Sequence, residues 1–176
     1  MALTTHLDAE LSAVSEAAAQ TLQSLPALEL MASADLDRGL TLAESRHIPA
    51  EQLDALYASA WALCEDGQFD KALPVVLLLA SHAAPDARHL FLAATCFQRT
   101  HKPAQAAQMY VQCLLMDAQH YAAMFRLGEC LQAMGDNEKA MGLFDAVIGI
   151  TPSDTQYDSL RHMAQQRNQG LRDAGW

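Results

Sequence analysis

Residues 124–152 read MFRLGECLQAMGDNEKAMGLFDAVIGITP, and their pattern recurs twice upstream at a constant spacing. In this stretch Ala140 follows the turn residue Gly135 and precedes Phe144 by four positions. Alanine also occupies the two equivalent upstream positions, Ala72 and Ala106, and each alanine lies 34 residues from the next. A fixed period of this length predicts an array of helical hairpins rather than one domain without internal repeats.

The three copies share the features that a pair of packed helices requires. Positions 4, 7, 8 and 11 of the unit form one helical stripe that is apolar except at Ser59 in the first copy, and small residues at positions 8 and 20 let the paired helices approach closely. Position 15 is glycine in the first and third copies, which suits a turn with positive φ, but it is His101 in the second. The pattern is that of the tetratricopeptide repeat. We therefore predict an all-α tetratricopeptide-repeat solenoid, with three helix hairpins and capping helices at both ends.

The predicted organisation has three parts. Residues 1–48 form an N-terminal helical region for capping or dimerisation, residues 49–152 hold the repeats, and residues 153–176 form a C-terminal capping helix. The repeats span about 53–86, 87–120 and 121–152. In the first part, apolar residues three or four positions apart predict an amphipathic helix. Its candidate contacts in a homodimer are Leu7, Leu11, Val14 and Leu22.

Composition and charge exclude several classes of function. Of the 176 residues, 51% are apolar, enough for a sizeable core, and the net charge is −10. Without a run of Lys or Arg the chain lacks the basic footprint of a nucleic-acid-binding protein. Its longest apolar stretch, Ala72 to Ala80, is nine residues, whereas a membrane span needs about 20. The N-terminus lacks the pattern of a secretory signal, so we expect a cytoplasmic protein without membrane insertion.

A second stripe on the first helix of each repeat is the main functional signal. Position 5 is aromatic in all three copies, and positions 9 and 12 follow it on the same helical face. A helix with two apolar stripes contacts two partners, and the hairpin supplies only one of them. The second partner is a peptide in a concave groove, another protomer or a neighbouring repeat. The candidate groove residues are Tyr57, Trp61, Cys64, Arg88, Phe91, Thr95, Gln98, Phe125, Glu129 and Gln132.

These positions also bear on the chemistry of the ligand. Tetratricopeptide domains that hold an acidic C-terminal tail use Lys and Asn at positions 2, 5 and 9 of their first helices. Here Arg88 is the only cation at those positions, which disfavours an acidic tail and favours an apolar extended segment.

The sequence lacks the usual signatures of catalysis and of metal binding. It contains no H-E-x-x-H, no C-x-x-C and no G-x-S-x-G pattern. The four cysteines are expected to be reduced structural thiols. We expect His82 and His89 to lie at the surface of the first inter-repeat turn. We therefore expect that the protein is not an enzyme and that it has no cofactor and no metal site.

Further stretches of the sequence, within about residues 36–150, carry a second signal. They are Gly39-Leu-Thr-Leu-Ala43, Ile48-Pro-Ala-Glu-Gln-Leu-Asp-Ala-Leu-Tyr57 and Gly67-Gln-Phe-Asp-Lys-Ala72, then Asp86-Ala-Arg88 with Cys96 and Gln98, Met116-Asp117, Phe125 and Glu129-Cys130. In their order and spacing these stretches resemble the class II chaperones of bacterial type III secretion, which guard pore-forming translocator proteins.

This resemblance implies a cytoplasmic, non-enzymatic chaperone that holds an extended segment of a translocator in its concave groove. The family's concave aromatic positions correspond to Tyr57 and Trp61, and to Cys64, where an aromatic is commoner. Members often form homodimers through N-terminal helices, and some also assist a transcriptional activator. The alternative is a general tetratricopeptide-repeat scaffold for another assembly.

Overall fold

The computed structural model describes residues 41–83, 85–150 and 155–175. They fall into two compact units, the first ending at His89 and the second beginning at Leu90. All regular structure in these residues is helical, which confirms the predicted all-α class. No described helix is both long and apolar enough to cross a bilayer. The division into three parts stays a prediction, and the predicted dimer contacts lie outside the described residues: Leu7, Leu11, Val14 and Leu22.

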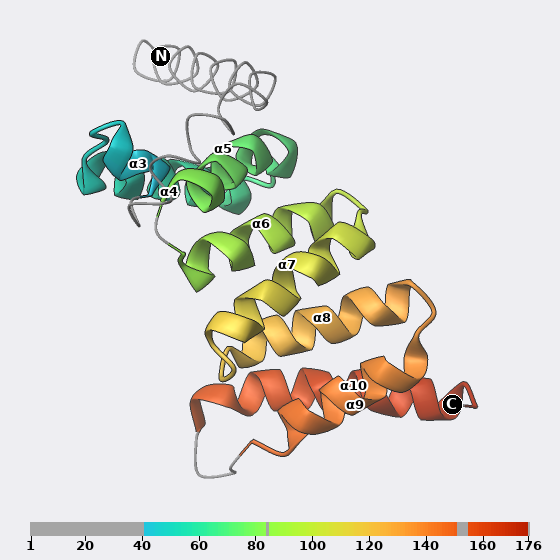
Figure 1. Ribbon diagram of the computed structural model, residues 1–176. Coiled ribbons are helices and arrows are strands. Elements are labelled where there is room, and N and C mark those ends of the chain that lie inside the picture. Colours follow the sequence, from blue (N-terminus) through green and yellow to red (C-terminus); the bar gives the residue numbers. More distant parts are fainter. Residues whose placement is uncertain (1–40, 84, 151–154, 176) are drawn as a thin grey trace. The chain divides into compact units, whose positions relative to one another are not determined.

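The first unit is built around one helical hairpin. Its helices α4 and α5 lie side by side, and the short helix α3 packs against α5 (Figure 1). The core of the hairpin contains the small residues Ala60 and Ala72, together with Leu63, Val76 and Leu79. The hairpin thus has small side chains at the two positions where the repeat pattern predicts a close approach. The bounds are α3 Leu42–Ser45, α4 Ala50–Glu65 and α5 Phe69–His82.

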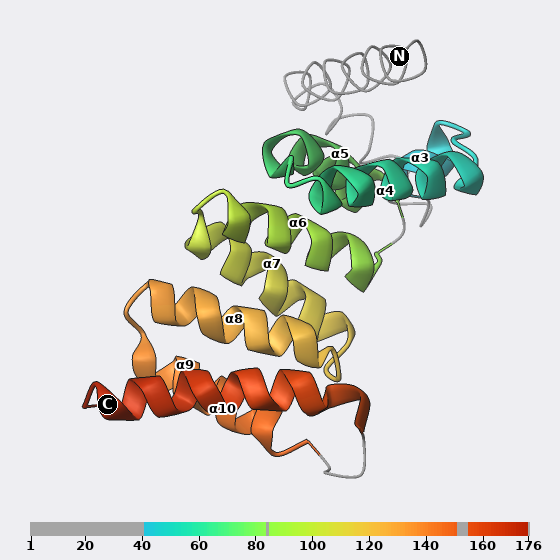
Figure 2. The ribbon, with the colours of Figure 1, turned by 180° about the vertical axis from the view of Figure 1, so that it is seen from behind.

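The second unit contains most of α6, then α7 to α10. Helix α7 packs on α8, α8 on α9, and α10 lies alongside α9 (Figure 2). Its core includes Phe144 and Val147 of α9 and Ala164 and Leu171 of α10, so the last helix buries apolar surface of the third hairpin. The bounds are α6 Ala87–Arg99, α7 Pro103–Met116, α8 Tyr121–Ala133, α9 Asn137–Ile148, the 3-10 turn η1 Thr155–Tyr157, and α10 Asp158–Asp173.

The three hairpins turn in the same way. In each, the residue at position 15 has a positive φ: 74° at Gly67, 60° at His101 and 84° at Gly135. The amide of the next residue donates to a carbonyl five residues back, as in the bond from Lys102 to Phe97 (2.9 Å). This pattern is the Schellman motif, which satisfies carbonyls at the end of a helix. His101 is therefore held in a left-handed conformation that costs a side-chain-bearing residue more than glycine.

Helices α8 and α9 approach each other closely at Gly128. A Cβ built on Gly128 would lie 2.6 Å from Cε1 of Phe144, whose side chain is fully buried. Glycine therefore lets α8 and α9 approach until the Phe144 ring contacts the α8 backbone. This contact is the physical reason for the small residue at position 8 of the third repeat.

Candidate functional site

The exposed aromatic surface of the first unit lies on α4. The ring centroids of Tyr57 and Trp61 are 6.4 Å apart, and Trp61 is 45% exposed. Cys64, almost one further helical turn along, is partly exposed. On another face of the same helix, Ala60 and Leu63 are buried in the hairpin. Helix α4 thus has one face that packs in the hairpin and another that carries the half-buried Tyr57 and the exposed Trp61.

Charged residues from the start of α6 surround Tyr57. The Arg88 guanidinium lies over the Tyr57 ring, 5.4 Å from its centroid. Asp86 holds Arg88 in place, because its Oδ2 accepts from Nε (2.9 Å) and from NH2 (2.7 Å) of Arg88. This hydrogen bonding keeps the pKa of Asp86 below its ordinary value. Burial raises the pKa of Tyr57, and the charge of Arg88 opposes that rise. The cluster is a neutral tyrosine beside an oriented cation.

The structure corrects the expectation that His82 and His89 lie at the surface. They are 4% and 7% exposed, and His82 Nε2 and His89 Nδ1 are buried without a hydrogen-bond partner. His89 packs against Tyr57, with ring centroids 5.5 Å apart. Burial lowers the pKa of both imidazoles. Polar residue type indicated the surface, but packing against neighbouring helices buries these rings.

In the second unit, the predicted residue Phe91 is only partly exposed. Its ring centroid lies 4.7 Å from that of His120, and the rings are stacked. It lies 5.7 Å from that of Tyr110. His120 also caps α8, because its Nδ1 accepts from the amide of Ala123 at 3.2 Å. Phe91 is thus a supported aromatic with a partly open face.

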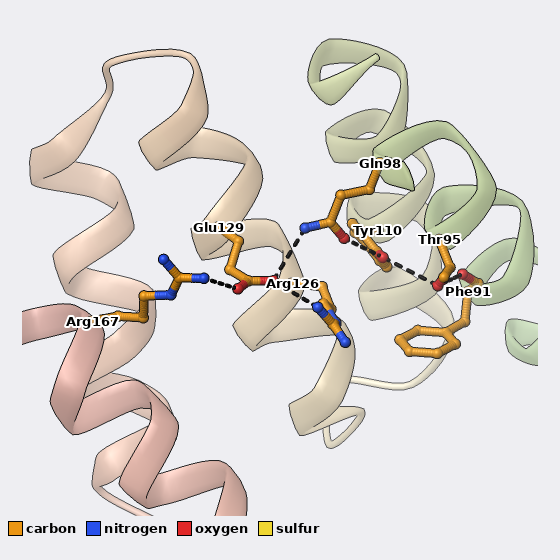
Figure 3. A network of polar contacts seen from close by, with 7 residues as sticks. All are labelled: Phe91, Thr95, Gln98, Tyr110, Arg126, Glu129 and Arg167. Atoms are coloured by element: carbon orange, nitrogen blue, oxygen red, sulfur yellow. Dashed lines mark hydrogen bonds and ion pairs between the residues drawn. The ribbon is translucent and has the colours of Figure 1, made fainter. Parts of the chain in front are cut away.

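The polar candidates of α6 and α8 form one hydrogen-bonded chain (Figure 3). Thr95 Oγ1 lies 3.2 Å from the Tyr110 hydroxyl, which donates to Gln98 Oε1 at 2.9 Å. Gln98 Nε2 donates in turn to Glu129 Oε2 at 3.1 Å. Burial raises the pKa of Tyr110 far above its ordinary value, so its hydroxyl remains a donor. The structure therefore brings together Thr95, Gln98 and Glu129 through Tyr110, a residue of α7 that was not among the predicted site residues.

Two arginines complete this chain at Glu129. Arg126 NH1 lies 2.9 Å from Oε2 and Arg167 NH2 lies 2.7 Å from Oε1, while the Glu129 side chain is only 12% exposed. Sequence reasoning missed both arginines. Arg126 occupies a position that the aromatic stripe does not include, and Arg167 comes from α10, 38 residues away.

The structure also corrects the assignment of Phe125 to the partner surface. Phe125 is 4% exposed, and its ring centroid lies 5.6 Å from that of Phe144 in the core of the second unit. Helices α8, α9 and α10 contribute to this core, so the ring is not open to a partner. Gln132, the next candidate on α8, is partly exposed.

Two hollows in the second unit were not predicted. One, of about 290 Å³, has Gln98, Glu129, Pro103 and Cys130 among its lining residues. The other, of about 770 Å³, is an apolar groove between α7, α8 and α9 that includes Val111 and Leu131. The described part of the chain contains no group of three His, Cys, Asp or Glu residues able to hold a metal ion.

Comparison with known proteins identifies sequences and structures that are similar to this chain. The sequence model of the tetratricopeptide repeat matches residues 99–164. Curated protein sequences give no significant match. Among solved structures, a type III secretion complex from Aeromonas hydrophila is similar, with a TM-score of 0.73 and 23% identity over 85% of this chain and 97% of that one.

Two further similar structures are chaperones with bound translocator segments. SycD of Yersinia enterocolitica, in complex with a peptide of the translocator YopD, has a TM-score of 0.68 and 19% identity over 73% of this chain and 98% of that one. PcrH of Pseudomonas aeruginosa, in complex with the chaperone-binding region of PopD, has a TM-score of 0.68 and 23% identity over 72% and 96%. The predicted tetratricopeptide fold is confirmed, and the chain shares it with translocator chaperones.

Proposed function

We propose that this protein is a cytoplasmic bacterial chaperone that binds an extended apolar segment of type III secretion translocator proteins. Binding keeps the translocator soluble and competent for secretion, and no catalysis is involved. The observation that carries the proposal is the aromatic pair on α4, the half-buried Tyr57 and the exposed Trp61, in a chain with the fold of SycD and PcrH.

The likeness supports the proposal because it includes nearly the whole of each chaperone. This chain covers 98% of SycD and 96% of PcrH, and both structures contain a translocator segment. A homodimer through Leu7, Leu11, Val14 and Leu22, and assistance to a transcriptional activator, belong to the same proposal.

The aromatic side chains of α4 leave apolar area exposed that an extended apolar ligand can bury. A tryptophan that is 45% exposed still has apolar area to bury, and aromatic anchors of this kind often contribute most of the binding energy. Ordering a flexible segment opposes binding, so we expect moderate affinity. A translocator exposes membrane-seeking surface that aggregates in water, and covering part of it shifts the equilibrium toward the soluble state.

The proposal is tested by co-expressing the protein with a translocator encoded next to its own gene. We expect Trp61→Ala and Tyr57→Ala to reduce co-purification of the translocator by at least about 30-fold, the loss typical of an aromatic hot spot. Leu115→Ala is the matched control, because Leu115 is 82% exposed on α7 and lies outside the predicted partner surface. Circular dichroism checks that all variants remain helical.

Fluorescence gives an independent readout in purified protein. The chain contains two tryptophans, so Trp176→Phe leaves Trp61 as the only one. Burial of Trp61 by a translocator peptide should shift its emission to shorter wavelength. Unchanged emission together with unchanged co-purification in both alanine variants would contradict the proposal.

The alternative function is a general repeat scaffold for another assembly. Mass spectrometry of proteins that co-purify with the wild-type chain distinguishes the two. A chaperone should retain large proteins with transmembrane segments, whereas a scaffold should retain soluble components of a different complex.

A further inference from the structure

Two guanidinium groups in the second unit share one carboxylate. Arg126 of α8 and Arg167 of α10 contact different oxygens of Glu129, at 2.9 and 2.7 Å (Figure 3). Gln98 donates to Glu129 as well, from α6. The carboxylate therefore holds two positively charged side chains from different helices in fixed positions at the end of the polar chain.

The charges in this cluster do not balance. Residues three and four positions from Arg167 on α10 are Met163, Ala164, Gly170 and Leu171, which carry no charge. The equivalent neighbours of Arg126 on α8 are Ala122, Ala123, Glu129 and Cys130, so Glu129 is the only acid among them. Within the described residues both arginines form their ion pairs with Glu129 alone, so these three side chains together carry a formal charge of +1, in a chain whose net charge is −10.

Exposure differs between the two signs of charge. The Arg126 and Arg167 side chains are 42% and 50% exposed, whereas Glu129 is 12% exposed. Each arginine uses one terminal nitrogen on Glu129, which leaves further N–H groups directed elsewhere. A ligand approaching from solvent therefore meets guanidinium donors before it meets the carboxylate.

Glu129, which holds these donors, also borders a hollow and a chain of polar side chains. Glu129 and Gln98 line the hollow of about 290 Å³, and the polar chain continues from Gln98 through Tyr110 to Thr95, next to Phe91. Planar guanidinium groups bind carboxylates with strong, directional hydrogen bonds. A single carboxylate matches the single excess charge, whereas the acidic chain as a whole repels a polyanion.

We propose that Arg126 and Arg167 bind the side-chain carboxylate of an Asp or Glu in the client segment, so that the client carries an acidic residue as well as apolar anchors. This inference rests on the proposed chaperone function. The sequence analysis considered only positions 2, 5 and 9 of the first helices, where acidic tails bind in other tetratricopeptide domains and where Arg88 is the only cation. Arg126 and Arg167 lie outside those positions, so this inference extends that argument.

Matched peptides test the inference. Overlapping 15-residue peptides of the co-purified translocator are measured against wild-type protein by calorimetry. The tightest binder that contains Asp or Glu is compared with its Asn or Gln counterpart. We expect the neutral peptide to bind about tenfold more weakly, equivalent to about 1.4 kcal/mol. Arg126→Gln and Arg167→Gln should weaken the acidic peptide by a similar factor and leave the neutral peptide unchanged.

Two further variants separate ligand binding from a merely structural role. Glu129→Gln removes the competing carboxylate, so it should strengthen binding of the acidic peptide. If Glu129 and the arginines only brace the helices, Glu129→Gln and Arg167→Gln should weaken both peptides together. Arg172→Gln is the matched control, because Arg172 is similarly exposed on α10 and its contact, at 3.7 Å, is with Asp145. Arg167→Lys, which retains the charge, should keep part of the preference for the acidic peptide.

The outcomes distinguish this inference from the proposed function. If wild-type protein binds no translocator peptide, both are overturned. If it binds peptides but none of them contains Asp or Glu, or if the arginine variants affect acidic and neutral peptides equally, the carboxylate site is overturned and the chaperone function stands. Loss of affinity confined to the acidic peptide supports the site.

Discussion

Substitution of Gly128 by alanine tests whether close helix packing decides the residue at this position. Helix propensity alone favours alanine over glycine by about 1 kcal/mol. In the folded protein, however, the added Cβ would lie 2.6 Å from Phe144 Cε1 and 3.1 Å from two neighbouring ring carbons. Phe144 is 0% exposed, so its ring has little room to move away.

The expected magnitude follows from these two opposing effects. Overpacking a well-packed core costs about 1–3 kcal/mol, and the short distance to a fully buried ring indicates the upper end of that range. After the gain in helix propensity, Gly128→Ala should lower the free energy of unfolding by about 2 kcal/mol. For a chain of this size, that corresponds to a melting temperature about 4–8 °C lower.

Gly142→Ala supplies the matched control. Gly142 is exposed on α9, and a Cβ there meets nothing within 4 Å. Only the propensity difference remains, so this variant should be more stable than wild type by up to about 1 kcal/mol. Urea titration followed by circular dichroism measures both values. If Gly128→Ala is as stable as wild type or more stable, the packing argument is wrong.

Three further predictions concern the turns, the buried histidines and the cysteines. His101→Gly should stabilise the protein by about 0.5–1 kcal/mol in urea titration, because relief of the left-handed conformation at φ 60° outweighs the greater conformational entropy that glycine loses on folding; destabilisation would contradict this. Burial lowers the pKa of His82 and His89 below 6.5, so the unfolded chain binds more protons. Their contribution to stability is fully present above the unfolded pKa of about 6.5 and is lost as the pH falls below it through the lowered folded pKa values, and a double Asn variant should show a flatter dependence. Iodoacetamide should label Cys64 first, as mass spectrometry can detect, because the other three cysteines are buried and burial raises the pKa of Cys130 to about 11; equal labelling rates would refute this.

The helices and turns were largely predictable from the sequence. Period, apolar stripes and small residues are local properties, and helices α4 to α9 of the structure all lie within residues 49–152, where the repeats are predicted. Even His101 adopts the conformation of the glycines at the equivalent positions. The hydrogen bonds and packing of the hairpin impose this turn on whichever residue occupies the position.

The candidate site was less predictable, because residues at equivalent repeat positions have different neighbours. Tyr57 and Phe125 both occupy position 5. Tyr57 lies beside the exposed Trp61 and beneath Arg88, whereas Phe125 is buried against Phe144. A repeat pattern assigns both rings to the same face of a helix, but burial depends on the residues that pack on that face.

The sequence by itself determined the all-α class, the 34-residue period, the turn positions and the aromatic stripe of α4, because these depend on residues close together along the chain. Only the tertiary structure decided that Phe125 is core, that His82 and His89 are buried, and that Glu129 holds Arg126 and Arg167. Those properties depend on side chains from different helices, such as the ion pair between α8 and α10 across 38 residues. The repeat pattern relates only residues that are close together in the sequence, so it does not predict contacts between different helices, which form when the helices pack.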